Sequence, residues 1–311
     1  MLFRRILLPL DNSASGEASI CYAKGIASAA NAELHLLHVV KEPQLRCYRY
    51  EWPTNARVPI SAKLPAPSRL ILPGRPAQTI VDYANHIDAD LIIMPTRGHG
   101  ILGQLFCGST TMDVIRNTTR PVWVLKRSLT NGEPYSCKRI VCGIELNTEG
   151  QEVLRYAARA AAAWNADLVI VHAIPGMSDA MLMLYGLDDT GEIELLPEVA
   201  RRKIESMAAH IQVPFQLEVS IDDPAQYLRR AAKKHRADLV IIGRGRNTNP
   251  WSIGANIGEI IARSNSPVIT YRPRTATRPT RGKGQQVTAR NPYIVLPFEQ
   301  PTTCEPVHST V

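Results

Sequence analysis

The sequence predicts a tandem α/β protein with two open, mostly parallel five-stranded sheets, each flanked by helices in a Rossmann-like layout and related by a pseudo-two-fold axis. Short apolar runs alternate with amphipathic segments along the chain, as in parallel sheets whose strands are joined by helices. The second half repeats the first at nearly constant offsets. The length of 311 residues is too great for one ordinary α/β domain and suits two.

Composition narrows the class of protein. Hydrophobic residues make up 45% of the chain and charged residues 21%, which is typical of a globular protein with a substantial core. No apolar run approaches the ~18 residues of a membrane span, and the apolar start is too short for a signal peptide. The six cysteines have neither CxxC pairing nor metal-site spacing. We therefore predict reduced thiols, no protein-bound metal and a cytoplasmic location.

The net charge of +8 is unevenly distributed. From Arg272 onward there are six basic and two acidic residues, so this stretch alone contributes +4. The remainder is only mildly basic, which makes nucleic acid an unlikely partner of the folded part.

The first half opens with an apolar run at residues 5–10 that ends in Asp11. Asn12, Ser13 and Glu17 are helix-start signals, and Asn31 suits the left-handed residue after that helix. A second strand is predicted at residues 33–40, a third at 69–72, a fourth at 91–94 and a fifth at 122–125. A helix with proline in its first turn begins near Pro76.

Five prolines lie between residues 41 and 68, so no continuous helix is possible there. We predict that an irregular segment replaces a helix over 41–68. It is interpreted either as a binding loop or as the remnant of a lost helix that the other half covers.

A glycine-rich loop follows the fourth strand, with glycine at positions 98, 100, 103 and 108. Ser109 is predicted as the N-cap of the next helix, where a hydroxyl and the helix N-terminus favour an anion. Residues 98–103 spell GxGxxG, but they follow a late strand, so a dinucleotide fingerprint is discounted. Ser109 also stands where a P-loop lysine belongs, so a P-loop NTPase is excluded.

The spacing Gly98, nine residues, Gly108, Ser109 resembles the nucleotide loop of the universal stress protein family. That resemblance implies ATP or another adenine nucleotide, with Mg²⁺, in the first half. It places the base at Pro9, Asp11 and Val39 and the phosphates at Gly98, His99, Gly100, Gly108, Ser109 and Thr110. Pro95 replaces the first glycine of the family pattern. Taken from the sequence alone, Asp11 is equally a loop carboxylate that caps the first helix.

The second half aligns with the first at offsets of 134, 148 and 146, which pair Asp11 with Glu145, Asp90 with Asp238 and Pro121 with Pro267. An insertion there supplies an amphipathic helix at residues 192–211. The second loop lacks two residues and has Ala255 in place of Ser109. We expect little or no nucleotide there, and Arg244 and Arg246 as solvated residues that could attract phosphate.

The predicted domains are residues 1–128 and 138–273, with a linker at 129–137 and a disordered basic tail rich in Pro and Thr at 274–311. In the resembled family the last strand pairs two subunits, so here residues 121–125 and 267–271 are expected to pair within the chain as a pseudo-dimer. A homodimer and an unknown protein partner stay open. The apolar patch at residues 293–298 of the tail is expected to dock on the body or on a partner.

Three function classes follow. The first is a nucleotide-binding stress-response or signalling regulator, and the second is a scaffold of the same fold that binds no nucleotide. The third is a hydrolase with His99 as its best catalytic candidate. With no base beside a nucleophile and no Walker lysine in the sequence, we predict no enzyme beyond slow ATP hydrolysis.

Overall fold

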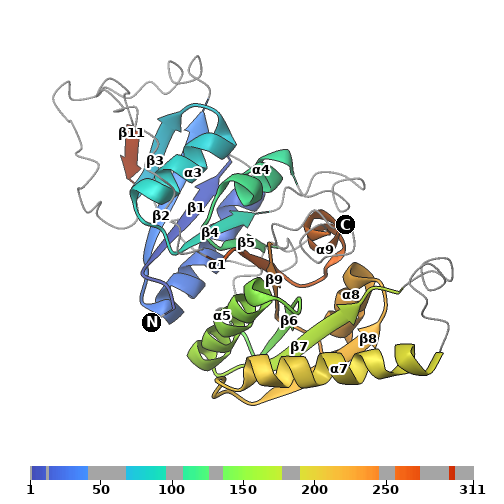
Figure 1. Cartoon of the computed structure of the whole chain (residues 1–311). Helices are drawn as coiled ribbons and strands as arrows, with labels where there is room; N and C mark the ends of the chain where they lie inside the picture. The colour runs from blue at the N-terminus through green and yellow to red at the C-terminus, as the bar shows by residue number, and fades with distance from the viewer. Residues whose placement is uncertain are drawn as a thin grey trace, which may run out of the picture.

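A mixed sheet of eleven strands runs through the part of the chain that the structure describes (Figure 1). The computed structural model describes residues 2–11, 14–40, 68–95, 108–125, 136–176, 190–244, 256–273 and 294–297. The strand order is β11-β3-β2-β1-β4-β5-β10-β9-β6-β7-β8. Each half contributes five strands that are parallel to one another, which confirms the predicted fold class.

The first half contains the predicted strands and helices. Its elements are β1 (Arg5–Leu10), α1 (Ala14–Ala30), β2 (Glu33–Val40), β3 (Ser68–Pro73), α3 (Pro76–His86), β4 (Leu91–Pro95), α4 (Ser109–Asn117) and β5 (Val122–Leu125). Asn31 follows α1 with φ 49°, the left-handed conformation expected of it. The Pro-rich segment predicted at 41–68 lies outside the described residues, except that Ser68 begins β3.

The second half repeats this series. Its elements are β6 (Arg139–Gly143), α5 (Thr148–Trp164), β7 (Asp167–Ile174), α7 (Thr190–Ala208), β8 (Phe215–Ile221), α8 (Pro224–Lys234), β9 (Leu239–Gly243), α9 (Ile257–Arg263) and β10 (Val268–Tyr271). The predicted amphipathic helix at 192–211 is α7, and it lies on β8 and β7.

The duplication extends to individual hydrogen bonds. One carboxylate oxygen of Asp90 accepts from the backbone N–H groups of Arg4 and Arg5, at 2.7 and 3.1 Å. Asp238 accepts in the same way from the residues that begin β6, at 2.8 and 2.9 Å. Each half thus fixes the start of its first strand through a carboxylate just before its fourth strand.

The two halves join where β5 and β10 pair antiparallel, with Trp123 opposite Ile269. This is the internal pairing expected of a pseudo-dimer, because a two-fold axis between neighbouring strands makes them antiparallel. The Trp123 side chain is fully buried, and its ring lies 6.3 Å from Tyr22 of α1 and 5.7 Å from Trp164 of α5. One indole therefore packs against a helix from each half.

Both faces of the sheet carry an apolar core that continues across the junction. On one face, Ile6 and Ile140 pack with residues of α1, α5 and α7. On the other face, Leu7 and Val141 pack with residues of α3, α4, α8 and α9. Successive residues of a strand point to opposite faces, so strands buried on both faces need apolar residues at successive positions, as β1 and β6 have after their first residue, an arginine in each.

The structure differs from the predicted disordered tail at Ile294–Pro297, which form strand β11. This strand pairs antiparallel with β3, with Val295 opposite Leu70, and lies at the sheet edge (Figure 1). It falls in the apolar patch expected to dock on the body or a partner, and here it lies on the body. Residues 274–293 and 298–311 are outside the described part, and the domain boundaries proposed above stay predictions.

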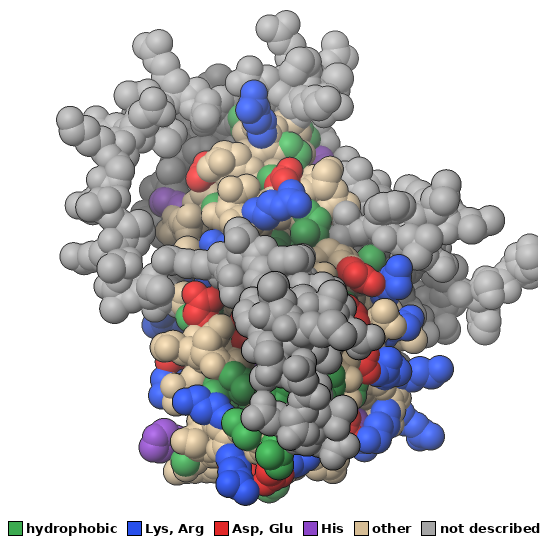
Figure 2. Space-filling view, turned by 45° about the vertical axis from the view of Figure 1, so that its right-hand side comes forward, with side chains coloured by type: hydrophobic (Ala, Val, Ile, Leu, Met, Phe, Trp, Pro, Cys, Tyr) green, Lys and Arg blue, Asp and Glu red, His purple; other side chains and the backbone are tan. Residues whose placement is uncertain are grey.

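Charges of both signs are interspersed on the face of the second half that Figure 2 shows. On α8, Lys234 pairs with Glu218, and Arg230 pairs with Asp222. Among the described residues, no helix combines the length and apolarity that a membrane span requires.

Candidate functional site

A cavity of about 200 Å³ opens in the first half, where β1, β2 and β4 end and α4 begins. The carboxyl ends of parallel strands are the usual ligand-binding edge of an α/β sheet. The lining residues are Pro9, Leu10, Asp11, His38, Val39, Pro76, Ile80, Met94, Pro95, Gly108, Ser109, Thr110 and Thr111.

Six of the nine residues predicted for the site line this cavity. They are Pro9, Asp11, Val39, Gly108, Ser109 and Thr110. The other three, Gly98, His99 and Gly100, lie outside the described residues. The apolar walls are Val39, Ile80 and Met94, while Asp11 and the start of α4 supply polar groups. Apolar walls with a few placed polar groups are typical of small-molecule sites.

The prediction that Ser109 is the N-cap of its helix is wrong by one residue. Gly108 is the N-cap, with φ −55° and ψ 146°, and Ser109 is the first helical residue. Gly108 has no side chain to cap this end of α4, and the first backbone bond within the helix is donated by Met112 to Gly108. The three preceding amides, those of Ser109, Thr110 and Thr111, lie at a helix N-terminus beside the cavity, an arrangement that favours an anion.

Gly108 has room for a side chain. A Cβ atom built on it would meet no atom of the described residues within 4 Å, and its backbone angles suit any residue. Glycine here is therefore not a requirement of local packing.

His38 is a cavity residue that sequence reasoning missed. Its Nδ1 donates to the carbonyl oxygen of Leu10 at 2.8 Å, which ties β2 to the end of β1 under the cavity. His172 makes the same bond to Ile144 in the second half, at 2.9 Å. The repeated pair at offset 134 was visible in the sequence, but a shared histidine does not reveal which backbone atom it meets.

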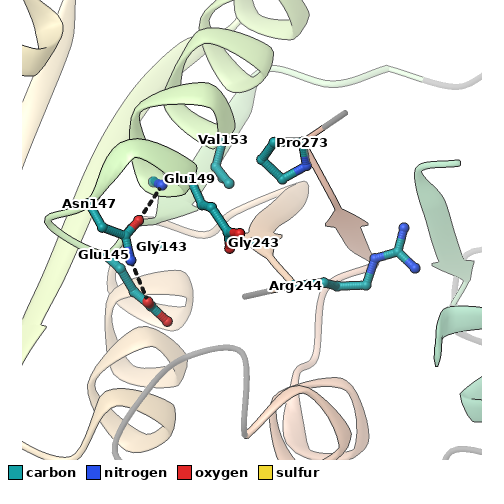
Figure 3. A pocket seen from close by; sticks show the side chains of 9 residues that line it. Gly143, Glu145, Asn147, Glu149, Val153, Gly243, Arg244 and Pro273 are labelled. Atoms are coloured by element: carbon teal, nitrogen blue, oxygen red, sulfur yellow. Dashed lines mark hydrogen bonds between the residues drawn. The ribbon is translucent and has the colours of Figure 1, made fainter. Parts of the chain in front are cut away.

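The corresponding region of the second half, whose lining residues are drawn in Figure 3, is nearly closed because little space remains between them. It holds a cavity of about 10 Å³ beside Glu145, Asn147, Glu149 and Gly243, which is room for about one water. The Asn147 side chain caps α5 by accepting from the Gly150 amide at 2.7 Å, and it donates to Glu145 at 3.0 Å. Two carboxylates on so small a cavity make it unsuitable for a phosphate.

The interpretation of Arg244 as a solvated residue is wrong. Its side chain points away from Glu145 and Asn147 (Figure 3), and only 2% of the residue is exposed. The guanidinium donates to carbonyl oxygens of Ile115, Thr118 and Arg120 in the first half. Arg246 lies outside the described residues.

These two unequal repeats match a known sequence family. The sequence model of the universal stress protein family matches residues 2–126 and, a second time, residues 136–272. The chain belongs to this family. The cavity lies in the first matched segment, and Arg244 lies in the second.

Similar proteins include one that matches most of the tandem chain and one that matches a single repeat. A universal stress protein of Mycolicibacterium smegmatis is 24% identical over 299 residues, which span 86% of this chain and 97% of that protein. A Thermus aquaticus universal stress protein is 33% identical over 138 residues, 40% of this chain and 100% of its own length. The solved structure of PA1789 from Pseudomonas aeruginosa, a protein of unknown function, superposes with a TM-score of 0.58 at 19% identity. It covers 87% of this chain and 93% of that one.

Proposed function

We propose that the cavity of the first half binds an adenine nucleotide, with ATP carrying Mg²⁺ as the ligand, and that the chain acts as a stress-response or signalling regulator. The observation that carries the proposal is the meeting of Asp11, Val39 and the uncapped start of α4 around one cavity. A flat base suits the apolar walls, Asp11 can accept from an exocyclic amine, and helix amides suit phosphates. The function is binding; turnover is at most slow.

The experiment is thermal unfolding of the whole chain with and without Mg-ATP. At ligand near 100 times Kd, binding to the folded state adds ~2.7 kcal/mol, which is a visible rise in Tm. Asp11→Ala should reduce this shift, because it removes the polar group on the base side. Glu145→Ala is the matched control, since Glu145 is the repeat-equivalent residue beside the nearly closed cavity.

No shift at millimolar Mg-ATP would reject nucleotide binding and favour the scaffold. A shift that Asp11→Ala and Glu145→Ala change equally would place the ligand elsewhere.

A further inference from the structure

Arg244 connects the second half to one end of a helix in the first. It directly follows β9, and its guanidinium is buried between the halves. Nη1 donates to the carbonyl oxygens of Ile115 and Thr118, the latter at 3.2 Å, and Nη2 donates to that of Arg120 at 2.6 Å. Three backbone acceptors from the other half thus surround one side chain.

These acceptors lie at the C-terminal end of α4 and in the turn before β5. The last carbonyls of a helix have no donor within the helix and carry partial negative charge. A buried guanidinium satisfies them and complements the helix dipole. Burial, with Arg272 nearby, lowers the pKa of Arg244 to about 9, so the group is still charged at neutral pH. The charge is balanced by carbonyl dipoles, with no ion pair to a carboxylate among the described residues.

The opposite end of the same helix lines the cavity. The helix has nine residues, so its ends are only ~13 Å apart. The helix also lies near the second half through Met112, which packs against the core cluster that contains Ile257 and Ile260 of α9. A short rigid helix held at one end has its other end placed as well.

We propose that Arg244 is a positioning residue for the first-half cavity: by holding the C-terminal end of α4, the second half sets the affinity of that cavity for adenine nucleotide. The inference rests on the proposed function. It gives the second repeat, whose own cavity is nearly closed, a direct part in the binding of the first.

The test compares the whole chain with Arg244→Met, Arg244→Lys and a control. Methionine fills part of the volume without a buried charge, but it leaves the three carbonyl oxygens without this donor, so a loss of folding stability is expected. Lysine keeps the charge but cannot reach three carbonyls as a planar fork does. The control is Arg139→Met, which removes a guanidinium–carbonyl bond of 2.6 Å, to His235, that lies wholly within the second half.

Two readouts are needed. Hydrogen exchange of the nucleotide-free protein should show faster exchange of α4 amides in Arg244→Met, by about tenfold, a smaller effect in Arg244→Lys, and none in Arg139→Met. Calorimetric titration with Mg-ATP should give a Kd raised by about tenfold, within the range usual for coupling between sites, with the same order among the variants.

Unchanged α4 exchange in Arg244→Met, or an unchanged Kd, overturns the inference while the proposed function stands. A wild-type chain that binds no Mg-ATP overturns both, and the titration of wild type separates the two cases. Should Arg244→Met not fold, Arg244→Lys decides by the same two readouts.

Discussion

At the scale of single residues, the two repeats keep the same supporting contacts and differ where the cavity is open or closed. Asp90 and Asp238 hold equivalent strand starts, and His38 and His172 bind equivalent carbonyls. The residues differ at the cavity. Glu145 of the second half stands in place of Asp11, and the cavity beside it has a volume of only about 10 Å³. The frame is thus common to both halves, and the capacity to hold a ligand differs.

His172 should make folding stability depend on pH. A carbonyl only accepts, so its Nδ1 carries the proton that binds Ile144. Burial lowers the pKa of His172, against the raising effects of that bond and of Glu145. Below about pH 6.5, His172 takes up a proton in the unfolded chain but stays neutral in the folded chain. The free energy of unfolding therefore falls as pH drops.

Urea unfolding at about pH 7.5 and about pH 5 measures this. The dependence should be weaker in His172→Gln and unchanged in His210→Gln, whose side chain is exposed. His35, whose pKa burial also lowers, contributes with the same sign and accounts for a residual slope. Equal slopes in wild type and His172→Gln would contradict the assignment.

Gly108→Ala should separate binding from folding. The added methyl meets no atom within 4 Å in the part of the chain that the structure describes, so the free energy of unfolding should fall by at most about 1 kcal/mol, the cost of a poorer N-cap. In the cavity, the same methyl occupies space that the ligand would fill. A steric cost of ~1.4 kcal/mol would weaken the binding of Mg-ATP about tenfold. Chemical denaturation and titration of the same sample give both values. Unaltered affinity would mean that the ligand does not approach Gly108.

The family resemblance named Asp11 and Val39, and the glycine–serine spacing named Ser109. The structure brings these three residues to one cavity because the carboxyl ends of parallel strands lie at the same edge of the sheet. Their part in binding stays a prediction. The N-cap was misplaced by one residue because glycine and serine both suit that position. Arg244 could not be placed, because its acceptors are backbone atoms of the other half and leave no side-chain pattern to read.

At the scale of elements, the two ends of the sheet are unequal. The equivalent strands β3 and β8 both lie at the outer side of their own half. β11 covers β3, whereas β8 is the last strand in the described sheet. Glu218 within β8 binds Lys234 and His235, and a charged residue within an edge strand discourages further pairing. β3 has Leu70, Ile71 and Leu72 after Arg69, and its outer edge pairs with β11.

Truncation after Pro273 should therefore expose β3. With its ladder to β11 removed, the β3 amides should exchange about tenfold faster, since each net hydrogen bond contributes ~0.5–1.5 kcal/mol. The amides of β8, at the other end of the sheet, are the internal control. Hydrogen exchange of full-length and truncated chains measures both, and unchanged β3 exchange would mean that β11 does not protect this edge.

Strands and helices with long periodic patterns were predictable, whereas β11 was not. The strand has four residues within a six-residue apolar patch, and this patch lies in a stretch whose Pro, Thr and Arg content indicates disorder. Nothing local distinguishes a docked strand from an exposed patch, because the partner strand lies more than two hundred residues earlier.

At the scale of the whole molecule, the continuous sheet and its two cores make the halves one mechanical unit. Apolar cores on both faces include residues of both repeats, and Trp123 contacts α1 and α5 across the junction. The offsets in sequence predicted the duplication, and the family resemblance implied the pairing of β5 with β10. The merging of both cores depends on side-chain packing at the junction, which periodicity does not describe.

We therefore expect a single unfolding transition. Trp123→Ala should lower the free energy of unfolding by ~3–5 kcal/mol for the entire chain, because the lost volume is shared by both halves. Circular dichroism during urea unfolding, together with exchange of β1 and β7 amides, tests this. Two separate unfolding transitions, of which Trp123→Ala shifts only one to lower urea concentration, would show that the halves unfold independently.

The position of β11 also affects the order in which the sheet is completed during synthesis. The ribosome makes β3 about 220 residues before the strand that covers it. At ~5–20 residues per second, the β3 edge stays unpaired for ~11–44 s on every nascent chain. During that interval an apolar strand edge is available to chaperones and to neighbouring nascent chains. The tail thus makes this protein more dependent on cotranslational protection than a single-unit relative without such a strand.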